Sequence, residues 1–306
     1  MIELENVSKL FGERLAVQNL TLTVRRGEIF GLLGHNGAGK STAIGMMLGQ
    51  VWPTDGLVRV CGHNVTTDRQ RALYKVGAIF ETPVFYDYLS GWRNLEILSH
   101  YSARTSAQRL QEVIDWVGLS GREHSHVKTY SHGMRARLAM AQALLPQPEL
   151  LILDEPGDGL DPEGIHEMRQ TILRLRSEME LTILLSSHLL SEVEQLCSRI
   201  AVMNQGQKVF EGTLESIRNS RNWVLLRVDN FSAAATLLLR EKLIVDQRDQ
   251  ALIALATNAK TEQVVCCLVQ NGFSVREITP QQQDLEGFYL SLMRSEERGP
   301  AGEGSS

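Results

Sequence analysis

Apolar runs of strand length alternate with amphipathic stretches from residue 1 to about residue 218. Glu28 to Leu33 predicts a buried strand, and Ser41 to Leu48, shortly after it, predicts a helix. Leu150–Leu153 and Leu181–Leu185 are two further apolar runs with the length of core strands. Between them Ile165, Met168, Ile172 and Leu175 recur at spacings of three and four, which predicts an amphipathic helix over about 163–179. This alternation of strands and helices predicts an α/β core.

A different pattern begins at Trp223. The segments predict, in order, a strand, a helix, two strands that form a hairpin, a helix and a strand: Trp223–Val228, Phe231–Lys242, Leu243–Asp246, Ala251–Ala256, Lys260–Gln270 and Phe273–Ile278. The order βαββαβ is the ferredoxin-like pattern. We therefore expect two domains, 1–218 and a small α+β domain over 219–294. Residues 295–306 are rich in Gly, Ser and Glu, and we expect a disordered tail there.

Composition narrows the class of protein. The length of 306 residues fits about two domains, and 43% hydrophobic residues supply material for a packed core. The net charge of -5 disfavours a nucleic-acid-binding protein, whose footprint is usually a basic face. No apolar run approaches the length of a membrane-spanning helix, and the N-terminus lacks the order of a signal peptide. The four cysteines have neither metal-site nor disulfide spacing, so we expect a soluble, intracellular chain.

The strongest chemical signal is a glycine-rich loop between the predicted strand and the predicted helix. Gly34-His35-Asn36-Gly37-Ala38-Gly39-Lys40-Ser41 matches the phosphate-loop pattern G-x-x-x-x-G-K-[ST], and with Thr42 these are the candidate nucleotide-binding residues. Glycines allow the backbone to wrap around phosphate with its N–H groups turned inward, at the positive end of the following helix. We expect Lys40 to reach the β- and γ-phosphates and the Ser41 hydroxyl to bind Mg²⁺.

Two acids follow the apolar run at Leu150–Leu153. A buried strand that ends in Asp154 and Glu155 delivers both carboxylates to the edge at which α/β sheets bind ligands. We expect Asp154 to hold Mg²⁺, directly or through water, and Glu155 to orient and deprotonate an attacking water. His188 follows the next core strand, reaches the same edge and is placed to contact the γ-phosphate. Glu155, His188 and Lys40 are therefore the candidate catalytic residues.

In this order and spacing, the three elements resemble the nucleotide-binding subunit of ATP-binding cassette (ABC) transporters, over residues 1 to about 218. Tyr130-Ser131-His132-Gly133-Met134 is similar to the signature loop of that family, usually LSGGQ, and Ser131 and Gly133 match it. By this resemblance, Ser131 and Gly133 contact ATP held by a second subunit. Phe11 matches the aromatic residue that stacks on adenine, and Asp161 matches the residue that helps to join the two subunits.

Glu81 is the most informative departure from the family, which usually has glutamine at this position, reaching Mg²⁺ and the attacking water. A glutamate retains an oxygen ligand for a hard cation and adds a negative charge near the phosphates. We therefore expect Glu81 to be a metal ligand beside Ser41 and Asp154. A glutamate here also resembles one branch of the family, bacterial exporters that protect against lantibiotic or bacitracin-like peptides.

The resemblance implies an ATPase with ATP and Mg²⁺ as cofactors. Two copies, or this chain and a paralogous subunit, clamp two ATP molecules head to tail and drive export through separate integral membrane permease subunits. The chain is then cytoplasmic and peripheral on the inner face of the membrane, with no nucleic-acid partner. The aromatic-rich loop from about Pro83 to Trp92 is the candidate permease contact.

Three alternatives remain open from the residues. The first is a soluble ABC-type ATPase that acts on ribosomes or DNA, and the second is a nucleotide-dependent regulatory module with negligible turnover. The third is a metal site formed by His124, His126 and His132, which lie close together in the sequence.

Overall fold

The computed structural model describes residues 1–80, 83–102, 105–218, 223–248, 251–256, 259–281 and 285–297. The chain forms two compact units, Met1–Gly212 and Thr213–Ser306. The short helix α8 (Leu214–Arg218) belongs to the second unit because it contacts α11 (Leu285–Glu297). The division therefore lies on the N-terminal side of residue 218, which was the boundary expected from sequence. No helix within the described residues is long and apolar enough to cross a membrane.

A six-stranded sheet forms the centre of the first unit, with the strand order β10-β9-β3-β8-β7-β6. Its strands are β3 (Ile29–Leu33), β6 (Val76–Ile79), β7 (Leu150–Asp154), β8 (Thr182–Ser187), β9 (Arg199–Asn204) and β10 (Gln207–Thr213). β3 pairs in parallel with both β8 and β9, and β7 pairs in parallel with both β6 and β8. The carboxyl ends of β3, β7 and β8 therefore meet at one edge.

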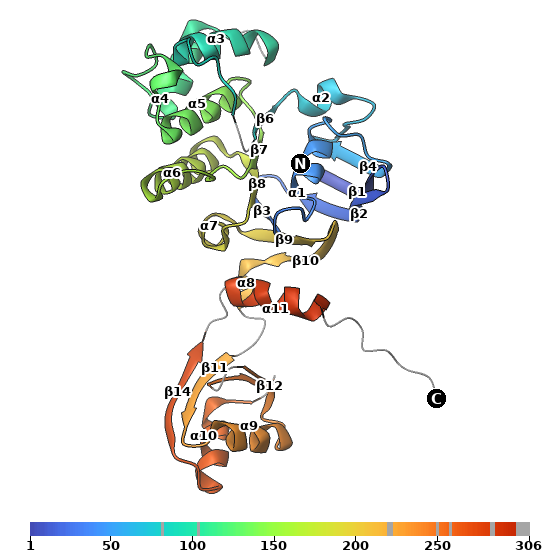
Figure 1. The fold of residues 1–306 in the computed structure, drawn as a ribbon, viewed down its shortest axis with the longest axis vertical. Helices are drawn as coiled ribbons and strands as arrows, with labels where there is room; N and C mark the ends of the chain where they lie inside the picture. The colour runs from blue at the N-terminus through green and yellow to red at the C-terminus, as the bar shows by residue number, and fades with distance from the viewer. Residues whose placement is uncertain are drawn as a thin grey trace. The chain divides into compact units, whose positions relative to one another are not determined.

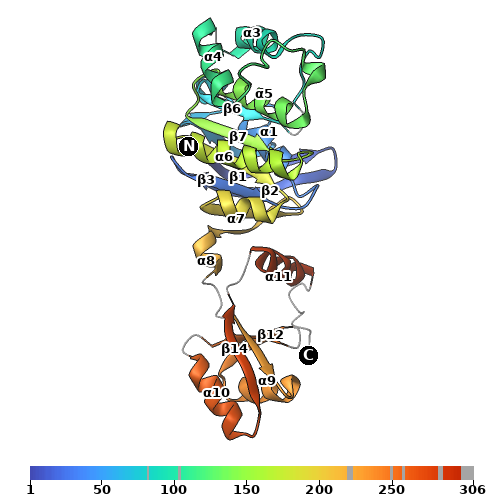
Figure 2. The same ribbon diagram turned by 90° about the vertical axis from the view of Figure 1, so that its left-hand side faces the viewer.

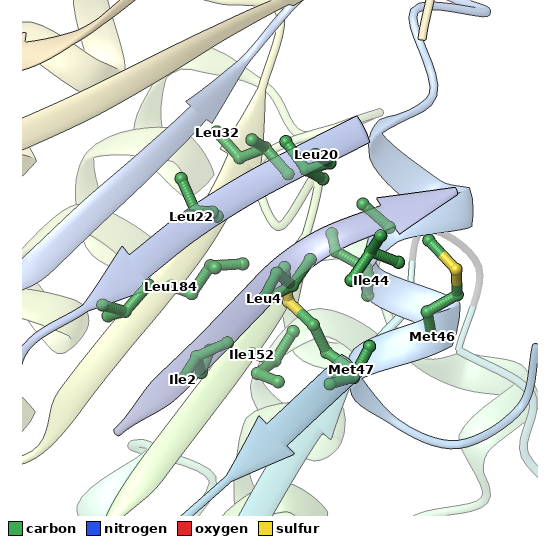
Figure 3. Packing of buried hydrophobic residues seen from close by; sticks show 14 of the residues in the cluster. Ile2, Leu4, Leu20, Leu22, Leu32, Ile44, Met46, Met47, Ile152 and Leu184 are labelled. Carbon is green, nitrogen blue, oxygen red and sulfur yellow. The ribbon is translucent and has the colours of Figure 1, made fainter. Parts of the chain in front are cut away.

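A second sheet, which the sequence pattern did not reveal, has the order β2-β1-β4-β5. Its strands are β1 (Ile2–Phe11), β2 (Arg14–Val24), β4 (Asp55–Val60) and β5 (His63–Asn64), and every neighbouring pair is antiparallel. Figure 3 shows how its side chains meet those of the parallel sheet and of helix α1 (Lys40–Met47) in one apolar core. The labelled members are Ile2, Leu4, Leu20, Leu22, Leu32, Ile44, Met46, Met47, Ile152 and Leu184, each at most 1% exposed.

Helices cover both faces of the parallel sheet. Figures 1 and 2 show α6 (Pro162–Met179) and α7 (Leu190–Leu196) on one face, with α1 and the antiparallel sheet on the other. The helices α3 (Gly91–Ser102), α4 (Ala107–Trp116) and α5 (His132–Leu144) pack on one another, and α5 contacts β6. The short helix α2 (Arg69–Leu73) contacts β5, and a 3-10 turn spans Val127–Thr129. This layered arrangement is the α/β fold expected from the alternating pattern.

The second unit has the βαββαβ order that the sequence predicts. Its elements are β11 (Trp223–Val228), α9 (Phe231–Arg240), β12 (Ile244–Arg248), β13 (Leu252–Leu255), α10 (Thr261–Gln270) and β14 (Val275–Gln281). The sheet order is β12-β13-β11-β14, with antiparallel neighbours. Val224, Leu226, Ile253 and Leu255 pack there against Ala234, Leu238, Val264 and Leu268 of the helices.

Helix α11 extends beyond the residue at which we expected disorder to begin. It runs to Glu297, so the expectation of a disordered tail is wrong for residues 295–297. The helix is anchored at its start, where Leu285 is 1% exposed, and α11 contacts α8. The rest of the expected tail, 298–306, lies outside the described residues.

Candidate active site

The glycine-rich loop joins the end of β3 to the start of α1. Gly37 and Gly39 have φ angles of 87° and 103°, which lie in the region that favours glycine. A Cβ atom at Gly39 would lie 2.7 Å from the carbonyl oxygen of Ala16, so the loop passes directly against β2. The Gly206 N–H donates to the carbonyl of Ala38 at 3.0 Å and ties the loop to the β9–β10 turn. Glycine is required here both for backbone angle and for space.

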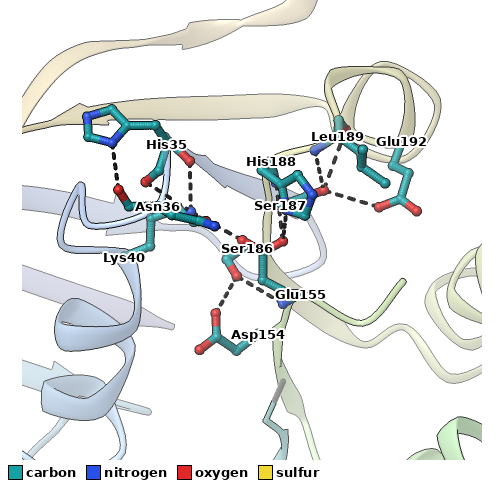
Figure 4. A network of polar contacts seen from close by, with 11 residues as sticks. His35, Asn36, Lys40, Asp154, Glu155, Ser186, Ser187, His188, Leu189 and Glu192 are labelled. Carbon is teal, nitrogen blue, oxygen red and sulfur yellow. Dashed lines mark hydrogen bonds and ion pairs between the residues drawn. The ribbon is translucent and has the colours of Figure 1, made fainter. Parts of the chain in front are cut away.

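Lys40, the first residue of α1, is 5% exposed. Its Nζ donates to the carbonyl of Gly34 at 2.7 Å and lies 3.2 Å from Oε1 of Glu155 (Figure 4). A buried ammonium needs such partners, because an unpaired charge in the interior is strongly destabilising. The lysine charge is thus held at the mouth of the loop, where the β- and γ-phosphates of a nucleotide would lie.

Asp154 ends β7 and is 5% exposed. In the parallel register it lies beside Ser186 of β8, whose hydroxyl donates to Asp154 Oδ1 at 2.5 Å. The same Ser186 oxygen accepts a hydrogen bond from the backbone N–H of Glu155 at 3.0 Å. One hydroxyl therefore holds the carboxylate of Asp154 and the backbone of Glu155, and nothing in the sequence motifs singles it out.

Glu155 stands between the lysine and the histidine. It has a φ of 52°, and its side chain is 11% exposed. Its Oε2 accepts hydrogen bonds from the Nδ1 and the backbone N–H of His188 (Figure 4). The Glu155 carboxylate therefore bridges the Lys40 ammonium and the His188 ring. The structure thus brings together the three candidate catalytic residues.

Lys40, Glu155 and His188 open onto one cavity of about 620 Å³, while the buried Asp154 beside them is not among its lining residues. The predicted residues that line it are Phe11, His35, Asn36, Gly37, Gly39, Lys40, Ser41, Thr42, Glu155 and His188. Phe11 is 49% exposed at the end of β1, and Lys9 Nζ lies 4.8 Å from its ring centroid. A flat aromatic ring, a phosphate-binding loop and a water-activating carboxylate along one cavity have the chemistry needed to bind and hydrolyse a nucleoside triphosphate.

Three residues that line this cavity were not predicted: Arg14, Ala16 and Asp158. Arg14 lies directly opposite Phe11 in the β1–β2 hairpin, so the pairing register brings it to the cavity. Asp158 follows Glu155 in a turn in which its N–H donates to the Glu155 carbonyl at 3.0 Å. Arg14 could have been predicted from the sequence by recognising the β1–β2 hairpin and pairing its residues outward from Phe11.

Comparison with known proteins is consistent with this geometry. Residues 17–158 match the family model described as ABC transporter. An uncharacterized ABC transporter ATP-binding protein of Bacillus subtilis (strain 168), YhcH, is 38% identical over 293 residues, covering 95% of both chains. This chain belongs to the ABC transporter ATP-binding proteins.

The chain is accordingly an ABC ATPase, the nucleotide-hydrolysing type of transporter subunit. The bacitracin transport ATP-binding protein BcrA of Enterococcus faecalis is 37% identical, with 96% of both chains covered. A solved ATP-binding cassette, dimeric and in a post-hydrolysis state with ADP and Pi, is 25% identical with a TM-score of 0.63, covering 70% of this chain and 99% of its own.

In this ABC ATPase, the signature-loop residues lie outside the nucleotide cavity. Ser131, Gly133 and Asp161 line a second cleft of about 420 Å³, and the two sets of lining residues have no member in common. Ser131 is the N-cap of α5, where its Oγ accepts from the N–H of Met134 at 3.2 Å. Asp161 is the N-cap of α6 and accepts from the N–H of Gly164 at 2.9 Å. Three of the predicted site residues therefore line a separate cleft of the chain.

The remaining candidates lie elsewhere. Glu81, the expected third metal ligand, lies outside the described residues. Gly34 and Ala38 are part of the loop, but they are not among the residues that line the cavity. The ring of His124 packs against that of Trp92, with centroids 5.7 Å apart. In the described part of the chain, no group of three or more histidine, cysteine or acidic side chains is arranged to hold a metal.

Proposed function

We propose that this chain powers an export transporter as one of two ATPase subunits that bind Mg-ATP head to tail. The separation of the two clefts supports this proposal most directly. The phosphate loop, Glu155 and His188 line one cleft, while Ser131 and Gly133 line another. A residue that contacts the γ-phosphate must meet the loop, so the second cleft requires the nucleotide of another subunit. An isologous pair then forms two composite sites.

Each side chain has a distinct part in the proposed reaction. Lys40 exchanges its contacts with Gly34 and Glu155 for the phosphate oxygens, and this exchange releases the Glu155 carboxylate. Glu155 then orients and deprotonates the attacking water, and His188 contacts the γ-phosphate. Ser131 of the other subunit places its hydroxyl and the start of α5 against the same phosphate. Phe11 stacks on adenine.

The residues present fit a magnesium ion. Ser41 and Asp154 offer hydroxyl and carboxylate oxygens, the donors that a small hard cation prefers. Ser186 holds Asp154 Oδ1 at 2.5 Å, an orienting contact of the kind that supports metal ligands. When bound, Mg²⁺ would neutralise charge on the β- and γ-phosphates. We retain Glu81 as a proposed further ligand.

We propose that integral membrane permease subunits dock on the loop at 83–92 and hold the chain at the inner face of the membrane. Val84 and Tyr88 of this loop are 84% and 68% exposed, and Tyr86 packs edge-on against Tyr88. Backbone hydrogen bonds from Val127 to Leu89 and from Lys128 to Asp87 join the loop to the segment that leads into Ser131. A partner seated here would thus be connected to the signature loop.

The cargo is proposed from similarity. Two relatives, both named BcrA and described as bacitracin transport ATP-binding proteins, align over 96% of this chain. Together with the glutamate at position 81, they favour export of a peptide antibiotic or drug. The membrane subunits would choose the cargo itself.

A mixing experiment tests the composite site. Lys40→Ala removes the phosphate-binding charge, while Ser131→Asp keeps a good helix cap and places a negative charge opposite the γ-phosphate. Each variant alone should lack ATPase activity. An equal mixture should regain about a quarter of the wild-type rate, since about half of the dimers are mixed and each contains one intact site.

The wild-type protein mixed with itself at the same total concentration is the control. If the mixture of variants remains as inactive as its components, while each variant is folded and still dimerises, the proposal that the two clefts complete one another in trans is contradicted.

A further inference from the structure

A buried carboxylate lies behind the active site and has no part in the reaction as described so far. Glu192, in the first turn of α7, is 7% exposed and is not among the residues that line the nucleotide cavity. Burial raises its pKa above the usual value, because the apolar surroundings disfavour the charged form. Burying a carboxylate costs free energy unless hydrogen-bond donors or charged groups compensate for the lost water.

Its first partner is the turn that carries His188. The hydroxyl of Ser187 donates to Glu192 Oε2 at 3.1 Å, and the Ser187 hydroxyl oxygen accepts from the N–H of Leu189 at 2.9 Å (Figure 4). Ser187 and Leu189 flank His188 on both sides. Glu192 therefore sets the rotamer of the hydroxyl that shapes the backbone around the histidine.

Its second partner is the loop that follows Glu155. A Cβ atom at Gly157 would lie 2.4 Å from Glu192 Oε1 and 3.2 Å from its Cδ, so the carboxylate occupies the space of a side chain at position 157. Gly157 is buried, and the loop continues through Asp158, which lines the nucleotide cavity, to Asp161 in the second cleft. A side chain at position 157 would therefore have to displace the Glu192 carboxylate from its place.

The charged groups around Glu192 come from several elements. Arg169 of α6 and His188 favour the ionised form electrostatically, while Glu155 opposes it. Cys197, at the end of α7, is buried nearby, and Glu192 contributes to raising the pKa of its thiol. The carboxylate thus lies at the junction of the His188 turn, the 157–161 loop, α6 and α7.

We infer that Glu192 is a positioning residue for ATP hydrolysis, which holds the His188 turn and the 157–161 loop in fixed relation. The inference rests on the proposed function, because it assigns the loop a place at the junction between two subunits. Glu192 acts through Ser187 and Gly157 and is not among the residues that line the nucleotide cavity. It links the residues at the γ-phosphate to the loop that leads to the second cleft.

If Glu192 is a positioning residue, its removal should lower kcat and leave the KM for ATP nearly unchanged. In Glu192→Ala, the loop and the turn lose their common support, and kcat should fall about 10- to 100-fold, since small misplacements of catalytic groups have effects of this size. The KM for ATP should change by less than about threefold, because the phosphate loop is untouched. Glu192→Gln keeps an oxygen that accepts from Ser187 and should retain kcat within about threefold of wild type.

A reciprocal pair of substitutions tests the contact itself. Gly157→Ala alone should lower kcat at least about tenfold, because its Cβ meets Glu192 Oε1. Adding Glu192→Ala to it should raise kcat above that of Gly157→Ala, since the space is then free. Gln195→Ala, an exposed position on the same helix, is the control and should behave as wild type.

Rates are expressed per ATP-binding site, measured by nucleotide titration, so that loss of folded protein is not counted as loss of kcat. If Glu192→Ala has the wild-type kcat per site, or if the double variant is no better than Gly157→Ala, the inference is overturned. If the wild-type chain itself does not hydrolyse ATP, the proposed function fails first, and the inference fails with it.

Discussion

The ion pair between Lys40 and Glu155 joins the two groups on which catalysis is proposed to depend. Both side chains are largely buried, and their nearest charged atoms are 3.2 Å apart. A carboxylate in contact with both an ammonium and His188 is held away from bulk water, and the arriving phosphates compete for the same lysine. Binding of ATP and release of the proposed base are therefore coupled through one residue.

Ser186 provides a test of how Asp154 is oriented. Ser186→Ala removes the hydroxyl that donates to Asp154 Oδ1 and accepts from the N–H of Glu155. We expect the Mg²⁺ concentration for half-maximal ATPase activity to rise about fivefold, the equivalent of about 1 kcal/mol. A titration of ATPase rate against Mg²⁺ at saturating ATP measures this. Ser177→Ala, exposed on α6, is the control, and equal half-saturation values for all three proteins would contradict the assignment.

Glu192 predicts a pH dependence of stability. Its pKa is raised in the folded protein, so its relative stabilisation is present below the usual value of 4.5 and is lost as the pH rises through the folded pKa. Glu192→Gln removes this loss. The variant should have a higher Tm than wild type at pH 7 to 8 and no advantage at pH 4, as measured by thermal unfolding. A variant less stable than wild type at pH 8 would contradict the sign.

Among the individual residues of the site, those that belong to a local motif can be predicted from the sequence. Lys40, Ser41, Asp154 and Glu155 lie in contiguous patterns, and the structure places them around one edge of the sheet. Ser186 reaches Asp154 because of the register between β7 and β8. Glu192 of α7 reaches Gly157, in a loop that is distant in the sequence. Such contacts join positions 32 and 35 residues from their partners, Asp154 and Gly157, and they leave no pattern in one sequence.

Among the structural elements, the phosphate loop is the most tightly enclosed by its neighbours. It is confined on one side by β2, through Ala16, and on another by the β9–β10 turn, through Gly206. The parallel register of β3, β7 and β8 then places the ends of three strands at the same edge. Residues far apart in sequence thus reach the phosphates without further adjustment.

Gly39→Ala tests the packing of this loop. The substitution adds backbone strain of about 1–2 kcal/mol and also forces a Cβ to within 2.7 Å of a carbonyl oxygen. We expect loss of ATP binding and a fall in Tm. Gly62→Ala has a similar positive φ, of 81°, but open space around the new Cβ, so it should cost strain alone and retain binding. Equal effects of the two variants, by calorimetry and thermal unfolding, would show that the close approach has no consequence.

The elements predicted best are those whose periodicity is unbroken. Leu150–Leu153 and the 163–179 helix were recovered as β7 and α6 with small shifts at their ends. The antiparallel sheet was missed for a physical reason. In β1 a register shift between Leu4 and Val7, with Asn6 at a φ of 50°, interrupts the alternation of buried and exposed residues. A bulge of this kind hides a strand from any test for period two.

At the scale of the whole molecule, the chain carries two incomplete halves of a site. The phosphate loop lines one cleft and Ser131 lines the other, and the two clefts have no lining residue in common. Under the proposed function, the chain needs partners: another ATPase subunit to complete the site, and membrane subunits to use its motion. The family resemblance implies that the Ser131 loop serves the nucleotide of another subunit, and the fold adds that the two sets of residues line different clefts of one chain.

The membrane partner leads to a prediction about location in cells. Tyr88→Asp places a charge on the exposed aromatic loop and should move much of the chain from the membrane pellet to the supernatant after cell lysis. The ATPase rate of the purified variant should stay at the wild-type value. Tyr74→Asp, at a site 74% exposed at the end of α2, is the control. If Tyr88→Asp pellets like wild type, the loop is not the docking surface.

The central claim is that Glu155 activates water in a site completed by a second subunit. The most direct measurement is the steady-state ATPase rate of Glu155→Gln, together with its molar mass in the presence of Mg-ATP. Hydrolysis should fall by about 10²–10⁴, the usual contribution of a general base, while ATP still binds and the protein accumulates as a dimer. Hydrolysis at the wild-type rate, or a monomer saturated with ATP, would contradict the account.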